Sequence, residues 1–253
     1  MIRSDTTSSQ AYGSEGWHCD GMARLVHLNG PPGIGKSTLS ALYADRNRGA
    51  LNLDVDVLHR LVGGWQDEET DTWPVVWALA RVMAATHLEG GRDVVLPQYI
   101  AKIDEIIGFE KLAHQHGASF REVVLLDNRE AAIARFDRRA QDSDDPWIRH
   151  HHRLIERAGG PVVLGTMFDN LMEVVHLRPG TVVVPSAVGA VQETYERLAD
   201  ALRVSVSAEP GPSGGQRVDA LQEGEAVEPG PCVGNEAVLD AAEVHPLDPD
   251  RLA

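Results

Sequence analysis

The segment HLNGPPGIGKSTLS, residues 27–40, constrains this chain more than any other, because from Gly30 to Ser37 it fits the pattern G-x-x-x-x-G-K-[ST]. A loop that wraps a row of phosphates turns successive backbone N–H groups inward, and its three glycines permit the dihedral angles and the close approach that this needs. In this pattern Lys36 reaches the β- and γ-phosphates and the Ser37 hydroxyl ligates Mg²⁺. The segment therefore predicts a phosphate-binding loop.

The flanks of the loop agree with this interpretation. The residues RLVHLN, Arg24–Asn29, resemble a short buried strand, and the apolar residues after the loop share one face of a helix. The loop thus lies between a strand and a helix N-terminus, where the partial positive charge favours a bound anion. The alternative, a chance match in a turn rich in Gly and Pro, does not account for both flanks. The residues expected to hold the nucleotide are Gly30, Pro31, Pro32, Gly33, Ile34, Gly35, Lys36, Ser37 and Thr38.

The ends of the chain differ from its middle in composition. Residues 205–253 hold six Gly, six Pro and ten Asp or Glu against two Arg, and carry a net charge of −8 of the total −15. We expect this acidic tail to be disordered, because it cannot bury enough apolar surface to offset chain entropy. Residues 1–21 are polar and lack a signal-peptide core, so they form a loose leader or Met22 is the functional start. Residues 22–204 have the length of one domain.

Composition also limits compartment and partners. Both cysteines, Cys19 and Cys232, lie in the two ends, so the sequence indicates neither a disulfide framework nor a metal site built on them. No apolar run approaches the length of a membrane span, and we expect a cytoplasmic protein. With only three lysines, the chain gives little electrostatic support to nucleic-acid binding.

Strand and helix signals alternate between residues 22 and 204, which predicts an α/β fold with a parallel sheet. Strands are expected at Arg24–Asn29, up to Leu53, and in the segments DVVLPQY, FREVVLLD and TVVVP. Helices are expected after the loop, at about 74–88 and 103–116, and in REAAIARFDRRAQ and AVQETYERLADALR. In the helix at 74–88, four apolar residues can share one face: Val75, Leu79, Val82 and Met83.

Two aspartates, Asp54 and Asp56, follow the second expected strand in LDVDVL. The strand ends of a parallel sheet open onto the same crevice as the phosphate loop. A carboxylate there can hold Mg²⁺ or accept the proton of an attacking hydroxyl. We assign Asp56 as the base and Asp54 to the metal, with Ser37. The alternative is that one of them is the N-cap of a helix that begins near Val57.

Seven arginines lie between positions 129 and 157, and three of them, Arg135, Arg138 and Arg139, share one helical face. The segment QDSDDPW separates two such helical stretches. Two helices lined with arginines suit a lid, at about 138–157, that closes over phosphates, and Arg135 and Arg139 are the candidates for catalysis. The alternative is an ordinary solvated surface. The three consecutive histidines at 150–152 point in different directions and do not predict a zinc site.

The segment between the aspartates and the third strand is rich in tryptophan. Trp65, Trp73 and Trp77 could wall an acceptor pocket, and Arg81 and Gln98 could anchor the acceptor. Aromatic residues at helical spacing can equally belong to the core. From these residues we predict Trp65, Arg81 and Gln98 as acceptor-binding.

With these motifs placed, the sequence resembles the P-loop small-molecule kinases, which include nucleoside, adenylylsulfate and gluconate kinases and chloramphenicol phosphotransferase. It is most similar to bacterial AAA-domain ATP-binding proteins of kinase type, through GPPGIGKST, LDVDVLHR, GRDVVLPQY and VVLLDNREAAIARFDRR over about residues 22–204. The resemblance implies a three-layer α/β/α P-loop NTPase fold, a five-stranded parallel sheet of order 2-3-1-4-5 and a helical lid. It also implies an ATP- and Mg²⁺-dependent transfer of the γ-phosphoryl group to a hydroxyl of a small molecule.

One departure and one alternative remain. The strand DVVLPQY ends in Pro97 and Gln98, without an acidic residue for Mg²⁺, so the metal would rely on Ser37 and Asp54. The run EVVLLD, which ends in Asp127, resembles the metal-side strand of ATPases and leaves open an ATP-hydrolysing switch or a regulatory ATP-binding protein. The sequence does not identify the acceptor, and it leaves the oligomeric state open.

Overall fold

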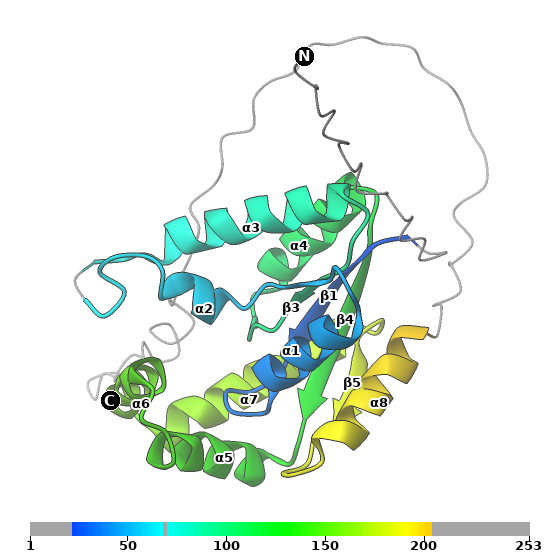
Figure 1. Ribbon diagram of the computed structural model, residues 1–253. Helices are drawn as coiled ribbons and strands as arrows, with labels where there is room; N and C mark the ends of the chain where they lie inside the picture. The colour runs from blue at the N-terminus through cyan, green and yellow to red at the C-terminus, as the bar shows by residue number, and fades with distance from the viewer. Residues whose placement is uncertain (1–21, 68–69, 204–253) are drawn as a thin grey trace, which may run out of the picture.

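Five parallel strands form the centre of the molecule in the computed structural model, which describes residues 22–67 and 70–203 (Figure 1). Their order in the sheet is β2-β3-β1-β4-β5, which confirms the predicted order. The leader, the acidic tail and both cysteines lie outside the described residues. The strands are β1 (Arg24–Asn29), β2 (Leu51–Asn52), β3 (Val94–Leu96), β4 (Ser119–Leu126) and β5 (Val182–Pro185).

The central strand β1 has the bounds that the sequence predicts, and all of its residues after Arg24 are buried. It pairs with β3 through Val26 and Val95 and with β4 through Leu28 and Val123. A parallel strand is covered on both faces, which explains why this run is almost continuously apolar. The phosphate loop therefore leaves the sheet from its most buried strand.

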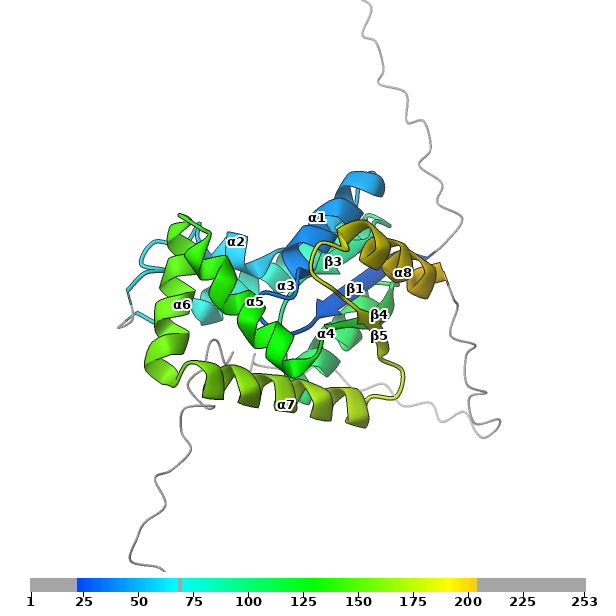
Figure 2. The same ribbon diagram turned by 90° about the horizontal axis from the view of Figure 1, so that it is seen from below.

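Helices cover both faces of the sheet, as Figures 1 and 2 show. On one face lie α1 (Lys36–Arg46) and α8 (Val191–Arg203), and on the other lie α3 (Trp73–Glu89) and α4 (Ile103–Gln115). Consecutive β1 residues point to opposite faces, so that Leu25 joins the core under α3 and α4 and Val26 joins the core under α1 and α8. The predicted three-layer α/β/α architecture is confirmed.

Helix α3 buries a different face from the one that its large aliphatic residues mark. Val75, Leu79, Val82 and Met83 do share a face, but they are exposed, Val82 by 64%. The buried face carries two tryptophans and small residues, with Trp77 at 6% exposure and Ala80 at 0%. The alanines let α3 approach the sheet closely, and the tryptophans fill the space at its N-terminal end.

Three further helices lie together at the carboxyl ends of the strands (Figure 2). They are α5 (Arg129–Gln141), α6 (Pro146–Ala158) and α7 (Pro161–Leu177). The bounds of α5 agree with the predicted helix, whereas the sequence analysis did not predict α7. Helix α7 begins with Pro at its first position, a usual start signal, and buries Leu164 and Met167 against residues of α5 and α6.

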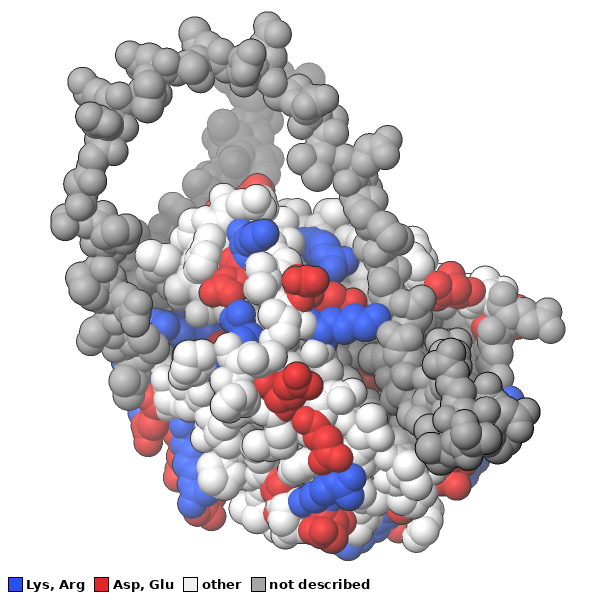
Figure 3. Space-filling view, turned by 180° about the vertical axis from the view of Figure 1, so that it is seen from behind, with Lys and Arg blue, Asp and Glu red and all other residues white. Residues whose placement is uncertain are grey.

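The surface carries charges of both signs. On the described part of the face in Figure 3, acidic and basic side chains are interspersed among uncharged ones, and the basic ones do not merge into one area. None of the helices in the described ranges is long and apolar enough to cross a membrane.

Candidate functional site

The predicted phosphate loop connects β1 to α1, and α1 begins at Lys36. Gly33 has a φ of 79°, in the left-handed region, and a Cβ there would lie 3.1 Å from the backbone N of Phe136 in α5. The loop is therefore packed directly against α5. Only glycine satisfies both the backbone conformation and the close approach at this position.

The Lys36 ammonium group folds back onto the loop. Its Nζ donates to the carbonyl oxygens of Gly30 at 2.7 Å and Pro31 at 3.0 Å. Burial lowers its pKa to about 8, with the Arg139 charge acting in the same direction and Asp56 opposing both. A desolvated cation held by neutral carbonyls gains from a nearby anion, so Lys36 fits a bound phosphate chain.

Asp54 takes the N-cap position that the sequence left open for one of the two aspartates, and it also lies beside Ser37. It is the N-cap of α2 (Val55–His59), where its carboxylate accepts the backbone N–H of Asp56 at 3.1 Å. It is also hydrogen-bonded to the Ser37 side chain, and its pKa is raised by burial and then by the Asp56 charge. A serine hydroxyl beside a carboxylate is the kind of oxygen pair that Mg²⁺ prefers, so Ser37 and Asp54 fit the ion.

Asp56, two residues on, points at the Lys36 side of the site. Burial raises the pKa of its carboxyl, and the Lys36 charge opposes the rise. The side chains of Trp147 and Gln98 hydrogen-bond to it. A carboxylate with a raised pKa and fixed orientation has the properties of a general base.

These groups meet at a cavity of about 290 Å³. At one end, here called the loop end, it is lined by Pro32, Gly33, Gly35, Lys36, Ser37, Thr38 and Arg139. At the other, here called the aromatic end, the walls come from α3, from the connection between β3 and α4, and from α6 and α7. Its main side chains are Trp73, Trp77, Tyr99, Trp147, His151 and Met167. Asp56 also lines the cavity.

The two arginines proposed for catalysis have different surroundings. Arg139 lines the cavity and acts electrostatically on both Lys36 and Asp56. Arg135 does not line it; its guanidinium donates to the carbonyl oxygens of Ile34 at 3.2 Å and Ser186 at 2.6 Å. It also pairs with Asp127 at 3.3 Å. Arg135 thus ties the phosphate loop to the ends of β4 and β5.

The pairing of Asp127 bears on the alternative of an ATP-hydrolysing switch. Its carboxylate is held by Arg135 and by the backbone N–H of Asn128, at 2.8 Å. Among the described residues that line the cavity, Asp127 does not appear, whereas Asp56 does. The carboxylate next to Lys36 therefore belongs to the segment after β2, not to the end of β4.

The three residues predicted to bind the acceptor differ in whether they line the cavity. Gln98 lines the cavity, and Trp65 and Arg81 are not among the described residues that do. Arg81 lies over the rings of Trp77 and Phe109, with centroid distances of 5.9 and 5.2 Å. Trp65 contacts Trp147 from outside, at 5.3 Å between ring centroids. Both side chains support the wall from behind.

Several lining residues were missed in the sequence, above all Trp147, which is the first residue after Pro146 in α6. Asp145 caps this helix by accepting the backbone N–H of Trp147 at 2.9 Å and pairs with Arg60, at the end of α2, at 3.0 Å. The Asp-Pro-Trp sequence is itself a helix-start signal that fixes where the indole emerges. Met167 belongs to the helix that was not predicted.

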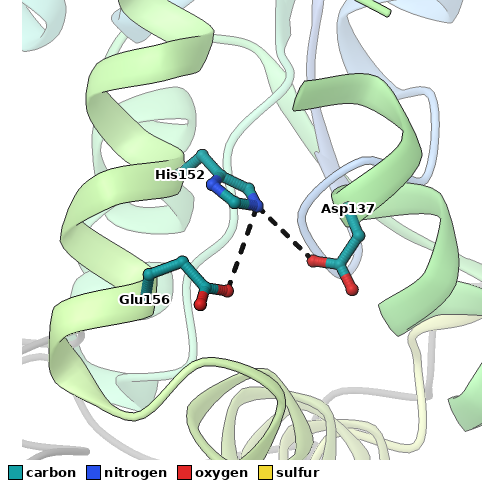
Figure 4. A group of neighbouring side chains, drawn as sticks. All are labelled: Asp137, His152 and Glu156. Atoms are coloured by element: carbon teal, nitrogen blue, oxygen red, sulfur yellow. Dashed lines mark ion pairs between the residues drawn. The ribbon is translucent and has the colours of Figure 1, made fainter. Parts of the chain in front are cut away.

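The three consecutive histidines lie in three different environments. His151 lines the cavity, its ring centroid is 4.0 Å from that of Trp147, and burial lowers its pKa to about 4. His150 contacts Trp65. His152 joins Asp137 of α5 and Glu156 of α6, with Nε2 at 3.6 and 3.9 Å from their carboxylate oxygens (Figure 4). This cluster joins α5 to α6 outside the cavity lining. The three histidines therefore do not form one set of metal ligands.

A protein family and several solved structures resemble this chain. The profile of a family described as an AAA domain matches residues 25–158. A gluconokinase from Sinorhizobium meliloti 1021 is 16% identical with a TM-score of 0.43, over 72% of this chain and 96% of that chain. The tunicamycin resistance protein of Deinococcus radiodurans is 16% identical with a TM-score of 0.48, over 74% and 99%. No curated protein matches the sequence.

Proposed function

The chain belongs to this AAA-domain family, of P-loop kinase type, and from that premise we propose that it transfers the γ-phosphoryl group of ATP to a hydroxyl of a small molecule. The observation that carries the proposal is the shared cavity of Lys36, Arg139 and Asp56. Two cations suited to phosphates and one carboxylate suited to a hydroxyl proton face the same space. We place the nucleotide phosphates on residues 30–38.

The reaction needs three events at this cavity. The acceptor oxygen forms a bond to the γ-phosphorus, the bond from that phosphorus to the β–γ bridging oxygen breaks, and ADP leaves with the electron pair. Asp56 accepts the hydroxyl proton, which its raised pKa favours. Mg-ATP supplies the phosphoryl group and the divalent charge when it is bound.

The remaining side chains position the reacting groups or neutralise their charge. Lys36 and Arg139 offset the negative charge that spreads over the phosphoryl oxygens. Ser37 and Asp54 would hold Mg²⁺. Arg135 keeps the loop in place through its bond to Ile34, which makes it a positioning residue. We propose that the segment at about 138–157 is a lid over the nucleotide, since it supplies Arg139, Trp147 and His151 to the cavity.

The test is an Asp56→Asn variant, followed by phosphorus NMR with Mg-ATP and a pool of hydroxyl compounds. We expect the wild-type protein to give a phosphorylated product, and the variant to lose about two to four orders of magnitude in rate while it still binds ATP. Asp104→Asn, at an exposed position of α4, is the matched control and should keep full activity. A fully active Asp56→Asn would remove Asp56 as the base. ATP hydrolysis in the wild type without any phosphorylated acceptor would replace the kinase reaction by the switch.

A further inference from the structure

The aromatic end of the cavity has a chemistry of its own, which bears on what the acceptor is. Three of the residues that line it are tryptophans, which are 5–8% exposed and pack against one another at tilted or edge-on angles, so that parts of their rings form an aromatic surface on the cavity. The ring centroids of Trp73 and Trp77 are 6.4 Å apart, and those of Trp73 and Trp147 are also 6.4 Å apart. His151 extends this surface, with its centroid 4.0 Å from Trp147. Tryptophan offers large, rigid area for stacking a flat ring.

The charges around this end balance. Of the charged side chains that line the cavity in the described ranges, Lys36, Asp56 and Arg139 belong to the phosphoryl-transfer chemistry. The other two, Lys102 and Glu105, have opposite signs and lie together at the start of α4. His151 is neutral above its lowered pKa of about 4. An acceptor with a net charge at this end would lose its hydration without gaining an opposite charge.

The volume of the cavity further limits which molecules can be the acceptor. A cavity of about 290 Å³ lies at the lower limit of small-molecule pockets, which measure roughly 300 to 1,000 Å³. Part of this volume lies at the loop end, where the phosphates are placed, so the remainder fits a small acceptor rather than a segment of protein or nucleic acid. The wall is also fixed, because the Tyr99 hydroxyl donates to the Met167 carbonyl oxygen at 2.9 Å and so joins the β3–α4 connection to α7.

The base sets where the hydroxyl must lie. The Trp147 side chain hydrogen-bonds to the Asp56 carboxylate and its ring also lines the aromatic end. A hydroxyl that reaches Asp56 therefore places the rest of the acceptor along Trp147 and toward Trp73 and Trp77. Resting on the proposed phosphotransfer, we propose that the acceptor is a small uncharged molecule in which a flat aromatic or heteroaromatic ring, stacked on these tryptophans, carries the reacting hydroxyl on a short aliphatic arm or sugar.

Binding can be tested apart from catalysis, because the three tryptophans themselves report it. The full-length protein is titrated without ATP, and its tryptophan fluorescence is followed with matched pairs of probes. Uridine and phenyl glucoside carry a ring; methyl riboside and methyl glucoside offer the same kind of sugar hydroxyls without it; gluconate and choline carry a negative and a positive charge. We expect saturable quenching by the ring-bearing probes, with affinities at least about tenfold above those of the other four, or about 1.4 kcal/mol of binding free energy.

The wall is tested by Trp77→Leu, which removes a ring but keeps an apolar residue. It should weaken binding of the ring-bearing probes by at least about tenfold. Phe120→Leu, which packs against the same core but does not line the cavity, controls for the loss of a core ring and should bind as the wild type does. Circular dichroism verifies that both variants are folded, and Trp77→Phe should recover part of the affinity.

The outcomes separate this inference from the proposed function. Tighter binding of gluconate or choline than of the ring-bearing probes would overturn it, and so would equal affinities within each matched pair or the absence of any saturable response. Ring-selective binding without a phosphorylated product in phosphorus NMR would sustain the inference about the pocket and refute the kinase reaction. Phosphorylation of a ringless or charged acceptor would refute the inference about the pocket and support the kinase reaction.

Discussion

The loop end and the aromatic end of the cavity differ in how the chain builds them. Most of the loop end comes from one short segment, between Pro32 and Thr38, together with Arg139 of α5. The aromatic end takes side chains from α3, the β3–α4 connection, α6 and α7, which are up to about ninety residues apart in sequence. Under the proposed function, a local structure would hold the phosphates, which every nucleotide shares, and a distributed one would hold the acceptor, which differs between kinases.

The largest expected effect isolates the loop end. Lys36→Ala should lower the rate of phosphoryl transfer by about two to three orders of magnitude, because a cation aimed at the developing charge is lost. Fluorescence quenching by ring-bearing acceptors should persist, since Lys36 does not contribute to the aromatic wall. Lys111→Ala, at an exposed position of α4, should change neither measurement. Loss of acceptor binding in Lys36→Ala would show that the two ends are not separable.

The second prediction concerns the stability of the protein at low pH. His27 of β1 is 1% exposed, and its Nε2 lies within hydrogen-bond distance of the Gln98 carbonyl oxygen, at 3.0 Å, so that His27 supports the β3–α4 connection. Because that carbonyl can only accept, Nε2 carries the proton in the neutral ring. Burial lowers the pKa of His27 from 6.5 to about 4. The stability held by the neutral ring is complete above pH 6.5 and is lost as the pH falls toward 4, by about 3 kcal/mol.

Urea unfolding at a series of pH values measures this loss. A His27→Gln variant, whose amide can still donate to the carbonyl, should show a flatter decline in the free energy of unfolding between pH 6.5 and 4. His114→Gln, at an exposed position of α4, should decline as the wild type does. A His27→Gln profile identical to that of the wild type would place the acid sensitivity elsewhere.

The third prediction compares two glycines of the loop end. Gly33 and Gly35 both have positive φ values, 79° and 109°, so alanine at either costs about 1 to 3 kcal/mol of strain. A Cβ at Gly33 also approaches Phe136 at 3.1 Å, whereas a Cβ at Gly35 meets nothing within 4 Å. Gly33→Ala should therefore melt at a lower temperature than Gly35→Ala, by about 2 to 4 °C for each additional kcal/mol. Equal melting temperatures would mean that α5 moves away from the added Cβ without a loss of stability.

The smallest expected effect is at the edge of the aromatic end. Arg60→Ala removes the 3.0 Å pair with Asp145, in which both side chains are more than a third exposed. Such pairs contribute at most about 1 kcal/mol, so stability and transfer should change little in a thermal melt and a rate assay. Asp145→Ala should cost more, because it also removes the cap of α6. A severe defect in Arg60→Ala would make this pair a necessary latch of the lid.

The local signals of strand, loop and helix predicted β1, whereas the order of the sheet came from the resemblance to the P-loop small-molecule kinases. The sequence analysis missed α7, although Leu164, Met167, Leu171 and Val174 recur at helical spacing, because further apolar residues such as Val162 stand among them on the exposed side. The face of α3 was hard to assign for a related reason. Its aliphatic residues mark the exposed side, and only the packing against the sheet selects the side with alanines and tryptophans.

At the site, Lys36, Asp56 and Gln98 were named from a linear motif or a strand end, and all three line the cavity. Trp73, Trp77 and Arg139 were named from helical segments, and they line it as well. Trp147 and Met167 were missed, because their place depends on how α6 and α7 fold back over the sheet. Arg135 shows the limit of helical periodicity. Its spacing with Arg139 places both on one face, yet one turn of helix separates a guanidinium bound to the loop backbone from one that reaches the cavity.

The double contact of Trp147 has an evolutionary consequence. Under the proposed function, Trp73, Trp77 and Met167 do not touch the base, so they can change as a lineage adopts a new acceptor wherever the replacement keeps the core filled. Trp147 cannot drift in the same way, because its side chain also hydrogen-bonds to Asp56. A descendant with another residue there must first find a new partner for that carboxylate. We therefore expect position 147 to be the slowest of the wall to diversify.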